Sequence, residues 1–363
     1  MNGSQLNVMN GAKNSSSNIS TTQIIQNNPN DSKRLTNFFG RKNKNPIENS
    51  ACLLACTINF LKAPDSKNTI QKLDKYMQRC KQIVTQENDK SSVQIADCQY
   101  LQIALHNLLL HAHLLPFEMK KSVYAILTSS LKISQSCCQY FTAHAKSITS
   151  YLFQYFEKNE MTFFTGNVLR ILLKQEFLDQ MLDLQLLESI IKVSKNAVFE
   201  IASEALETFH VIFKQKKPKQ KEILSKFLLD NHSEVFKLFV ELAETENYLA
   251  KRDILLTLNQ ILSDPVNKQF NLKFINDKEN LKRVMTILSS EEQGGFKEVA
   301  LILFDHFLQG FSTIENEKVK HIIERNKLLL IQCIKQCVNE TNHEGQGEQE
   351  DRKDYMIHIL EEI

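Results

Sequence analysis

The stretch that decides the fold prediction is Phe296-Lys-Glu-Val-Ala-Leu-Ile-Leu303, because its pattern of apolar residues occurs twice earlier in the chain. The earlier copies are Ala202-Ser-Glu-Ala-Leu-Glu-Thr-Phe209 and Ala250-Lys-Arg-Asp-Ile-Leu-Leu-Thr257. The three copies begin at positions 202, 250 and 296, so successive copies are 48 and 46 residues apart. This period approaches the roughly 40–47 residues of armadillo and HEAT units, in which two or three helices stack on the next module. The spacing predicts a helical-repeat protein.

Apolar residues at helical spacing also mark the segments around these copies. Each such stripe makes one face of a helix apolar, and that face needs a neighbouring helix to cover it. We expect Ser233 to be the N-cap of one helix, and the Gly294-Gly295 pair to be a break before another. The stripes are formed by Val235, Leu238, Phe239 and Leu242, by Leu281, Val284, Met285 and Leu288, and by Phe296, Val299, Ala300, Leu303, Phe304 and Phe307.

The composition favours helices joined by short polar turns. Only 9 Gly and 6 Pro occur in 363 residues, which is few for hairpins, bulges or phosphate-binding loops. The 44 basic and 42 acidic side chains nearly cancel, so no overall field attracts nucleic acid or anionic lipid. We expect a cytoplasmic protein without membrane insertion, because the sequence has neither an N-terminal signal segment nor 18 consecutive apolar residues.

The predicted fold is all-α, an armadillo/HEAT-like right-handed helical-repeat solenoid forming an elongated rod with a concave face. We expect a disordered Asn/Ser-rich tail over residues 1–37, because it is polar and carries little periodic hydrophobicity. The repeat domain is predicted over 38–338, an acidic linker over 339–352 and a C-terminal helix over 353–363.

The residue types that carry chemistry do not form a recognisable catalytic, cofactor or metal motif. Cys52 and Cys56 lie four apart in an apolar periodic segment, as do Cys333 and Cys337, so buried reduced thiols are predicted rather than zinc ligands. A separation of two residues puts His111 and His113 on different faces of a helix. No calcium-binding loop is present.

One dense basic run lies around Pro218, where we expect a loop between helices. Its members are Lys214, Lys216, Lys217, Lys219 and Lys221. The run is compatible with contact to nucleic acid or with an import signal, but no aromatic side chains interleave as a stacking platform for bases. A solvated loop is the favoured interpretation.

Several segments of the chain together resemble those of a known protein family. The segments are Ile201-Ala-Ser-Glu-Ala-Leu-Glu-Thr-Phe209, Glu246-Asn-Tyr-Leu-Ala-Lys-Arg252, Glu279-Asn-Leu-Lys282 with Met285, Gly166-Asn-Val-Leu-Arg170, Phe117-Glu-Met-Lys-Lys-Ser-Val-Tyr-Ala125, and Phe38-Phe-Gly-Arg-Lys42 followed by Pro46. They resemble the calcium-binding protein 39 (morula protein 25) family, strongly over residues 166–338 and more weakly over 38–165.

This resemblance implies an armadillo-like scaffold without catalytic activity. Its concave face is expected to hold a germinal-centre-class kinase or pseudokinase in the active conformation, and an apolar pocket near the C-terminal end to accept a Trp-Glu-Phe-type tail of that partner. Phe199, Tyr248 and Arg252 match family positions on the kinase-binding surface. Met285 matches the tail-binding region, and Arg325 matches a basic position suited to the tail's glutamate.

The residue pattern alone leaves other roles open for these positions. Met285 belongs to a periodic stripe, which favours the core, and Phe199 is equally suited to packing between repeats. Tyr248 and Arg252 are four apart on one helix face, and either role suits them. Two positions depart from the family: Leu256 stands where the family has lysine, and Pro265 where it has arginine.

We therefore predict a non-enzymatic scaffold, without cofactors, that binds and activates a kinase or pseudokinase in signalling for polarity, morphogenesis or cell division. The protein is expected to be a monomer within hetero-complexes and to bind no nucleic acid. The alternative is a generic armadillo/HEAT adaptor in transport or nucleic-acid assemblies, for which the basic run is the supporting feature.

Overall fold

The computed structural model describes residues 45–86, 89–174, 177–243, 248–289, 295–339 and 346–363. Within these ranges the regular structure is helical and includes no strand, which confirms the all-α prediction. The chain divides into two compact units. The first contains the described residues up to Leu114 together with Ala125–Ser134, and the second contains Leu115–Tyr124 and Gln135–Ile363.

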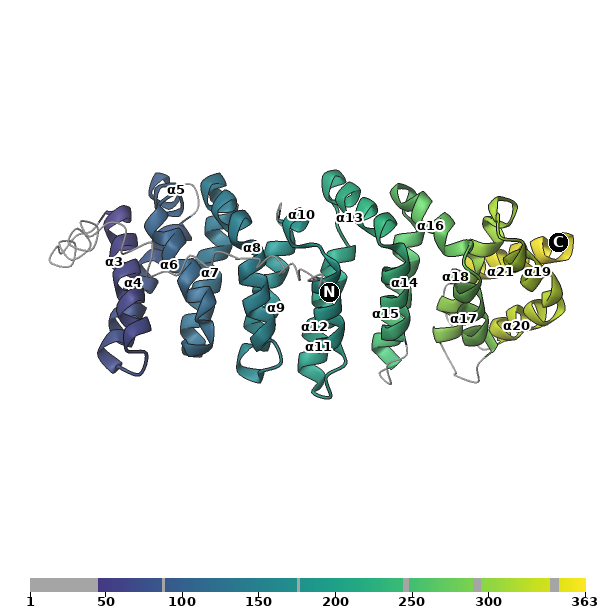
Figure 1. Cartoon of the computed structure of the whole chain (residues 1–363), viewed down its shortest axis with the longest axis horizontal. Helices are drawn as coiled ribbons and strands as arrows, with labels where there is room; N and C mark the ends of the chain where they lie inside the picture. Colours follow the sequence, from purple (N-terminus) through teal and green to yellow (C-terminus); the bar gives the residue numbers. More distant parts are fainter. Residues whose placement is uncertain (1–44, 87–88, 175–176, 244–247, 290–294, 340–345) are drawn as a thin grey trace, which may run out of the picture. The chain divides into compact units, whose positions relative to one another are not determined.

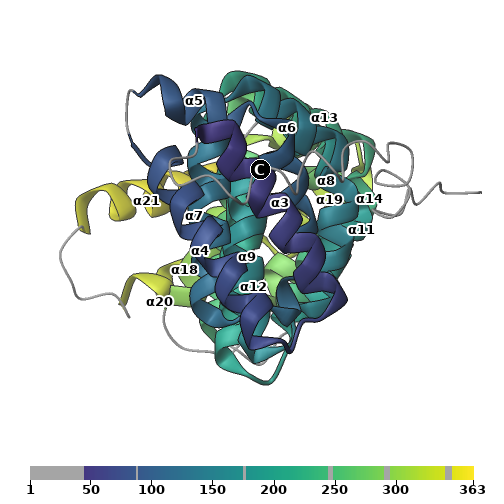
Figure 2. The ribbon, with the colours of Figure 1, turned by 90° about the vertical axis from the view of Figure 1, so that its left-hand side faces the viewer.

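The first unit is a helical bundle built on α3, which packs against α4, α5 and α6 (Figures 1 and 2). A capping box fixes the start of α3: the Asn45 side chain accepts a hydrogen bond from the Glu48 N–H at 2.8 Å, and Glu48 accepts one from the Asn45 N–H at 3.2 Å. The unit comprises α3 (Pro46–Lys62), α4 (Lys67–Val84), α5 (Lys90–Ala96), α6 (Gln99–Leu110), η1 (Ala112–Leu114) and the second half of α7 (Phe117–Ile133).

The second unit contains the helices in which the sequence repeat was found. Its elements are α8 (Gln135–Tyr155), α9 (Asn159–Lys174), α10 (Leu178–Met181), α11 (Leu184–Ser194), α12 (Phe199–Phe213), α13 (Pro218–Asp230), α14 (His232–Ala243), α15 (Tyr248–Ser263), η2 (Pro265–Asn267), α16 (Lys268–Ile275), α17 (Lys278–Ser289), α18 (Gly295–Gln309), η3 (Phe311–Thr313), α19 (Glu317–Arg325), α20 (Lys327–Asn339) and α21 (Gln346–Glu362), preceded by the first half of α7.

The three copies of the repeat occupy equivalent helices. They fall on α12, α15 and α18, and α12 contacts α15 while α15 contacts α18. Each module has three helices, because α10, α13 and α16 each follow a long helix pair and lie along the same side of the unit in Figure 1. This stacking of equivalent helices confirms the helical-repeat prediction.

Phenylalanine rings connect the modules through the core. The Phe209 and Phe239 ring centroids are 5.5 Å apart between α12 and α14, those of Phe236 and Phe274 are 5.5 Å apart between α14 and α16, and those of Phe274 and Phe307 are 5.2 Å apart between α16 and α18. These separations are typical of interacting aromatic pairs. The predicted apolar stripes are buried here, except that Met285 is only partly buried and the Phe296 side chain lies outside the described part.

Several predicted boundaries differ from the structure. Ser233 lies inside α14, which already begins at His232, so the N-cap prediction was wrong. Pro218 is the first residue of α13, so Lys219 and Lys221 are helical and only Lys214, Lys216 and Lys217 precede the helix. Proline is well suited to this position because the first helical N–H needs no partner within the helix.

The C-terminal region is more helical than predicted. Helix α21 begins at Gln346, within the segment 339–352 that was predicted as a linker. The predicted tail, residues 1–37, lies outside the described residues. The described helices do not combine the length and apolar character that crossing a bilayer requires.

Candidate functional site

The centre of the candidate site is Met285, a partly buried residue on α17 that lines a pocket of about 450 Å³. The pocket lies between α17, α19 and α20. We call it the Met285 pocket. Its wall contains Lys282, Met285, Thr286, Leu288, Ser289, Ile322, Asn326, Leu329, Leu330 and Cys333.

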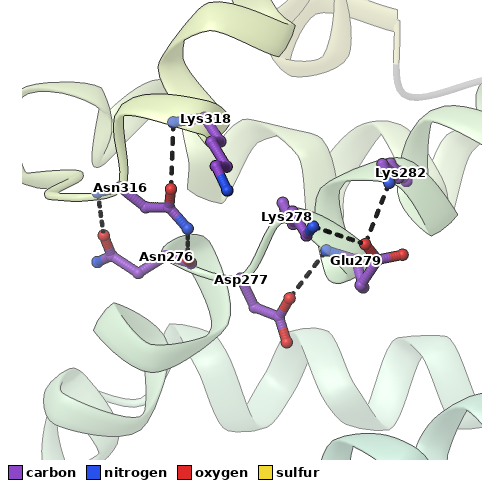
Figure 3. Close-up of polar contacts among 7 residues, drawn as sticks. All are labelled: Asn276, Asp277, Lys278, Glu279, Lys282, Asn316 and Lys318. Carbon is purple, nitrogen blue, oxygen red and sulfur yellow. Dashed lines mark hydrogen bonds and ion pairs between the residues drawn. The ribbon is translucent and has the colours of Figure 1, made fainter.

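Two asparagines join the start of α17 to the start of α19, two of the helices that line the pocket (Figure 3). The Asn276 Oδ1 atom accepts a hydrogen bond from the Asn316 N–H at 3.1 Å. It also accepts one from the Glu315 N–H at 2.7 Å. The Asn316 amide donates in return to the Asn276 carbonyl oxygen at 2.9 Å, and its Oδ1 caps α19 by accepting from the Lys318 N–H. Asp277 supports the first turn of α17 by accepting from the Glu279 N–H at 2.8 Å.

A lysine lies on the wall of the Met285 pocket, and the pairing of Arg325 with a tail glutamate stays a prediction. Lys282 lines the pocket, and its Nζ is 3.1 Å from a carboxylate oxygen of Glu279. The hydrogen bond from Lys282 is the main reason why the pKa of Glu279 is lowered. Arg325 is exposed at the end of α19 and is not a lining residue. Lys282 is therefore the basic side chain among the residues that line the pocket in the described part of the chain.

The pocket also has apolar residues that the sequence comparison did not single out. Leu329 lines it although 51% of its surface is exposed, and the preceding Leu328 is 81% exposed. Leucines this exposed at the start of a helix indicate a surface suited to a partner. The sequence itself indicated this exposure, because the three consecutive leucines Leu328-Leu329-Leu330 cannot all lie on one buried face of a helix.

The residues matched to the kinase-binding surface lie on α12 and α15. Phe199 is the first residue of α12 and is 64% exposed, so it is not the inter-repeat packing residue that the pattern alone allowed. Arg252 is partly buried on α15, which contacts α12. Tyr248 begins α15, but its side chain lies outside the described part of the structure. Neither Phe199 nor Arg252 lines the Met285 pocket.

The two departures from the family pattern lie close to these residues in the chain. Leu256 is partly buried one turn after Arg252 on α15. Pro265 opens the short helix η2, where Asp264 is the N-cap. The Asp264 carboxylate is 2.6 Å from the Lys221 Nζ, and the hydrogen bond from this lysine lowers the pKa of Asp264. One lysine of the basic run is thus paired within the protein.

The structure also places the cysteine and histidine candidates. Cys52, Cys56 and Cys333 are buried free thiols, while the Cys337 side chain lies outside the described part. His111 is the C-cap of α6, and His113 lies in the short helix η1 that follows. Among the described residues, no group of three or more His, Cys, Asp or Glu side chains is arranged to hold a metal ion.

Comparison with known proteins identifies relatives along almost the whole chain. The model of the Mo25-like family matches residues 37–363. The calcium-binding protein 39-like protein of Mus musculus is 26% identical over 338 residues, covering 90% of this chain and 97% of the relative. The Mo25-like protein of Schizosaccharomyces pombe is 28% identical over 313 residues, covering 82% of this chain and 91% of the relative. The MO25-like protein 2 of Caenorhabditis elegans is 25% identical over 333 residues, with 90% of each chain covered.

Proposed function

The chain belongs to the Mo25-like family, and from this premise we propose that it is a non-catalytic scaffold that binds and activates a germinal-centre-class kinase or pseudokinase. In this proposal the scaffold binds the active conformation of its partner more tightly than the inactive one and so shifts the equilibrium toward activity. Such a mechanism requires contact surfaces and no catalytic group. The proposal puts the protein in the cytoplasm, where its thiols stay reduced.

The Met285 pocket carries the proposal. It combines apolar walls from Met285, Leu329 and Ile322 with the cation of Lys282, and it lies near the C-terminal end of the chain. The family resemblance implies a partner tail of the Trp-Glu-Phe type. Aromatic side chains suit the apolar walls, and the glutamate of the tail is suited to Lys282 with Arg325 at the edge. The position of Lys282 makes it the first partner of that glutamate in our proposal.

The second contact surface in the proposal comprises Phe199, Tyr248 and Arg252. Aromatic and arginine side chains are the commonest energetic anchors of protein interfaces. Phe199 supports this role because it presents a large exposed ring at the start of a helix. The lysine and arginine missing at positions 256 and 265 make this surface less basic than in relatives that match the family pattern better, so we expect a different preference among partner kinases.

The test of the proposal measures binding and activation with purified components. A fluorescent Trp-Glu-Phe tail peptide is titrated with the full chain, and the activity of a purified germinal-centre-class kinase is measured with and without it. We expect Leu329→Asp to weaken peptide binding at least tenfold, because it puts a charge on the apolar wall. We expect Arg252→Ala to reduce kinase activation without changing peptide binding, because Arg252 does not line the pocket.

A matched control is Lys226→Ala, which removes an exposed cation from α13, away from both proposed surfaces. It should bind and activate like the unmodified protein. Unchanged peptide affinity in folded Leu329→Asp would contradict the assignment of the tail site. The absence of activation across a panel of germinal-centre-class kinases would contradict the proposed function as a whole.

A further inference from the structure

A second pocket lies on the other side of α17, between α14 and α17, and the proposed scaffold function does not use it. It has a volume of about 220 Å³. From this pocket, we propose that the protein binds a small aromatic molecule that carries one anionic group, such as an aryl carboxylate. The pocket is lined by Phe236, Phe239, Val240, Ala243, Leu255, Leu258, Phe274, Asn280, Arg283, Val284, Thr286, Ile287 and Leu303.

The pocket exists because two equivalent helices of successive modules do not close on each other. Helix α11 packs directly on α14, whereas within the described residues α14 and α17 make no comparable contact. Tilted phenylalanine rings contact one another near the start of α14: the Phe236 centroid is 4.6 Å from that of Phe270 and 5.5 Å from that of Phe274. The space beyond these rings is left open.

The apolar walls favour an aromatic occupant. Rings of Phe236, Phe239 and Phe274 line the pocket, and aromatic pairs gain stability beyond the area that they bury. An apolar cavity of about 150 Å³ in another protein is large enough to bind benzene. The pocket described here is larger and partly open, which is compatible with two fused rings.

An exposed cation gives the pocket its preference for an anion. Asn280 lines the pocket from α17 and is 4% exposed, but its Nδ2 atom already donates to the Phe274 carbonyl oxygen at 3.3 Å. Arg283 lies one turn nearer the solvent-exposed edge and is itself exposed. Among the described residues, no carboxylate is within ion-pair distance of Arg283. The nearby Glu279 is paired with Lys278 and Lys282, and the Arg283 charge makes a smaller contribution to lowering the pKa of Glu279. The Arg283 cation remains available for an acidic group of the ligand.

The pocket is distinct from the Met285 pocket although both use α17. Arg283, Val284 and Ile287 face the first, while Lys282, Met285 and Ser289 face the second. Only Thr286 borders both pockets among the described residues. Substitutions can therefore be placed on either face of α17 separately, which makes the proposal testable independently of the proposed kinase function.

The test uses 2-naphthoate as the probe and methyl NMR of the full chain as the readout. We expect saturable shifts of the methyl signals of Val240, Val284 and Ile287. The neutral analogue 2-naphthamide should bind about tenfold more weakly, because it lacks the charge that pairs with Arg283. An absence of saturable shifts at these three residues up to millimolar 2-naphthoate would overturn the proposal.

Three substitutions sharpen the test. Arg283→Gln should weaken 2-naphthoate binding about tenfold while leaving 2-naphthamide binding unchanged. Val240→Phe should abolish binding by filling the pocket, and its thermal unfolding establishes that it is folded. Lys318→Gln, which removes an exposed cation from α19, is the control and should bind normally. Unchanged binding by folded Val240→Phe would overturn the assignment of the pocket, and equal loss in Lys318→Gln and Arg283→Gln would overturn the role of Arg283.

Discussion

Asn276 and Asn316 hold the starts of α17 and α19 together through reciprocal hydrogen bonds. The Asn316 Nδ2 atom donates to the Asn276 carbonyl oxygen at 2.9 Å, and the Asn276 Oδ1 atom accepts from the Asn316 N–H at 3.1 Å. The Met285 pocket lies farther along the same two helices, where residues from Lys282 to Ser289 on α17 and Ile322 on α19 line it.

Replacing the Asn276 side chain should destabilise the protein. Asn276→Ala removes the acceptor for the N–H groups of Glu315 and Asn316 and the donor to the Leu272 carbonyl oxygen. We expect a loss of about 1–3 kcal/mol in the free energy of unfolding, measured by urea titration. Asn276→Asp keeps the acceptor and should lose less. Equal stability of the two variants would contradict this account.

Replacing Gly166 in α9 with alanine should not stabilise the protein, although alanine is usually more stable than glycine inside a helix. A Cβ atom at Gly166 would lie 2.5 Å from Oε2 of Glu204, whose carboxylate is 2.8 Å from the Arg170 Nη1 atom across the α9–α12 contact. Both charged side chains are largely buried. Alanine in place of a helical glycine normally raises the free energy of unfolding by about 0.5–1 kcal/mol. Here the Glu204 carboxylate must move away from Arg170 to make room for the new Cβ atom.

The corresponding measurement is a double-mutant cycle by urea unfolding. We expect Gly166→Ala to stabilise the Glu204→Ala background by about 0.5–1 kcal/mol and to give no gain, or a loss, in the unmodified chain. The difference isolates the displaced ion pair, because the helix preference is common to both backgrounds. Equal stabilisation in the two backgrounds would show that the carboxylate moves without cost.

His306 should make stability depend on pH. Its Nε2–H donates to the Asn259 Oδ1 atom at 2.9 Å and its Nδ1 accepts from the Asn271 amide at 3.4 Å, a pattern that requires the neutral ring. Burial lowers the pKa of His306, Arg352 lowers it further and Asp305 opposes the shift. The unfolded state therefore binds the proton more readily, so the contribution is present above the unfolded pKa of about 6.5 and is lost as pH falls through the folded pKa.

Thermal unfolding between about pH 5 and pH 8 checks this prediction. The unmodified protein should lose stability as the pH falls, and His306→Gln should lose less because it has no titrating ring. Part of the dependence should remain, because burial also lowers the pKa of His210. A steeper acid loss in the variant than in the unmodified chain would contradict the assignment.

The docking of α21 should depend on one ion pair with α18. The Arg352 Nε atom is 2.7 Å from the Asp305 Oδ2 atom, and the Asp305 side chain is 1% exposed. Arg352→Ala removes the positive charge from this buried carboxylate and leaves the neutral Gln309 amide donating to it at 2.8 Å. We expect the free energy of unfolding to fall by about 1–3 kcal/mol and amide hydrogen exchange in α21 to become faster.

Neutralising the buried partner is the control for this prediction. Asp305→Asn combined with Arg352→Ala should cost less than the sum of the two single substitutions, because neither charge is left unpaired. Additive losses would indicate that the two side chains do not interact. Amide hydrogen exchange in α12 should be unchanged in all three variants, because α15 lies between α12 and α18 in the series of helix contacts.

The predicted stripes show how far sequence reasoning extends. Val235, Leu281 and Phe304 are buried as predicted, because a period near 3.6 residues defines the apolar face of a helix without any knowledge of its neighbours. The prediction that Ser233 is an N-cap was wrong, because serine is also accepted within the first turn of a helix, and α14 already begins at His232. Helix α21 was placed too late, because acidic and glycine residues obscured the helical pattern at its start.

Sequence periodicity and the recurrence of similar segments every 48 and 46 residues determined that the chain is a stack of helical modules, because both are properties of local chain geometry. Only the tertiary structure decided that Met285 borders a pocket, that Lys282 rather than Arg325 is the cation on its wall, and that α14 and α17 leave space between them. These features depend on how far apart neighbouring helices are held. That distance is set by contacts between distant residues, such as Asn276 with Asn316 and Phe236 with Phe274, which no local pattern encodes.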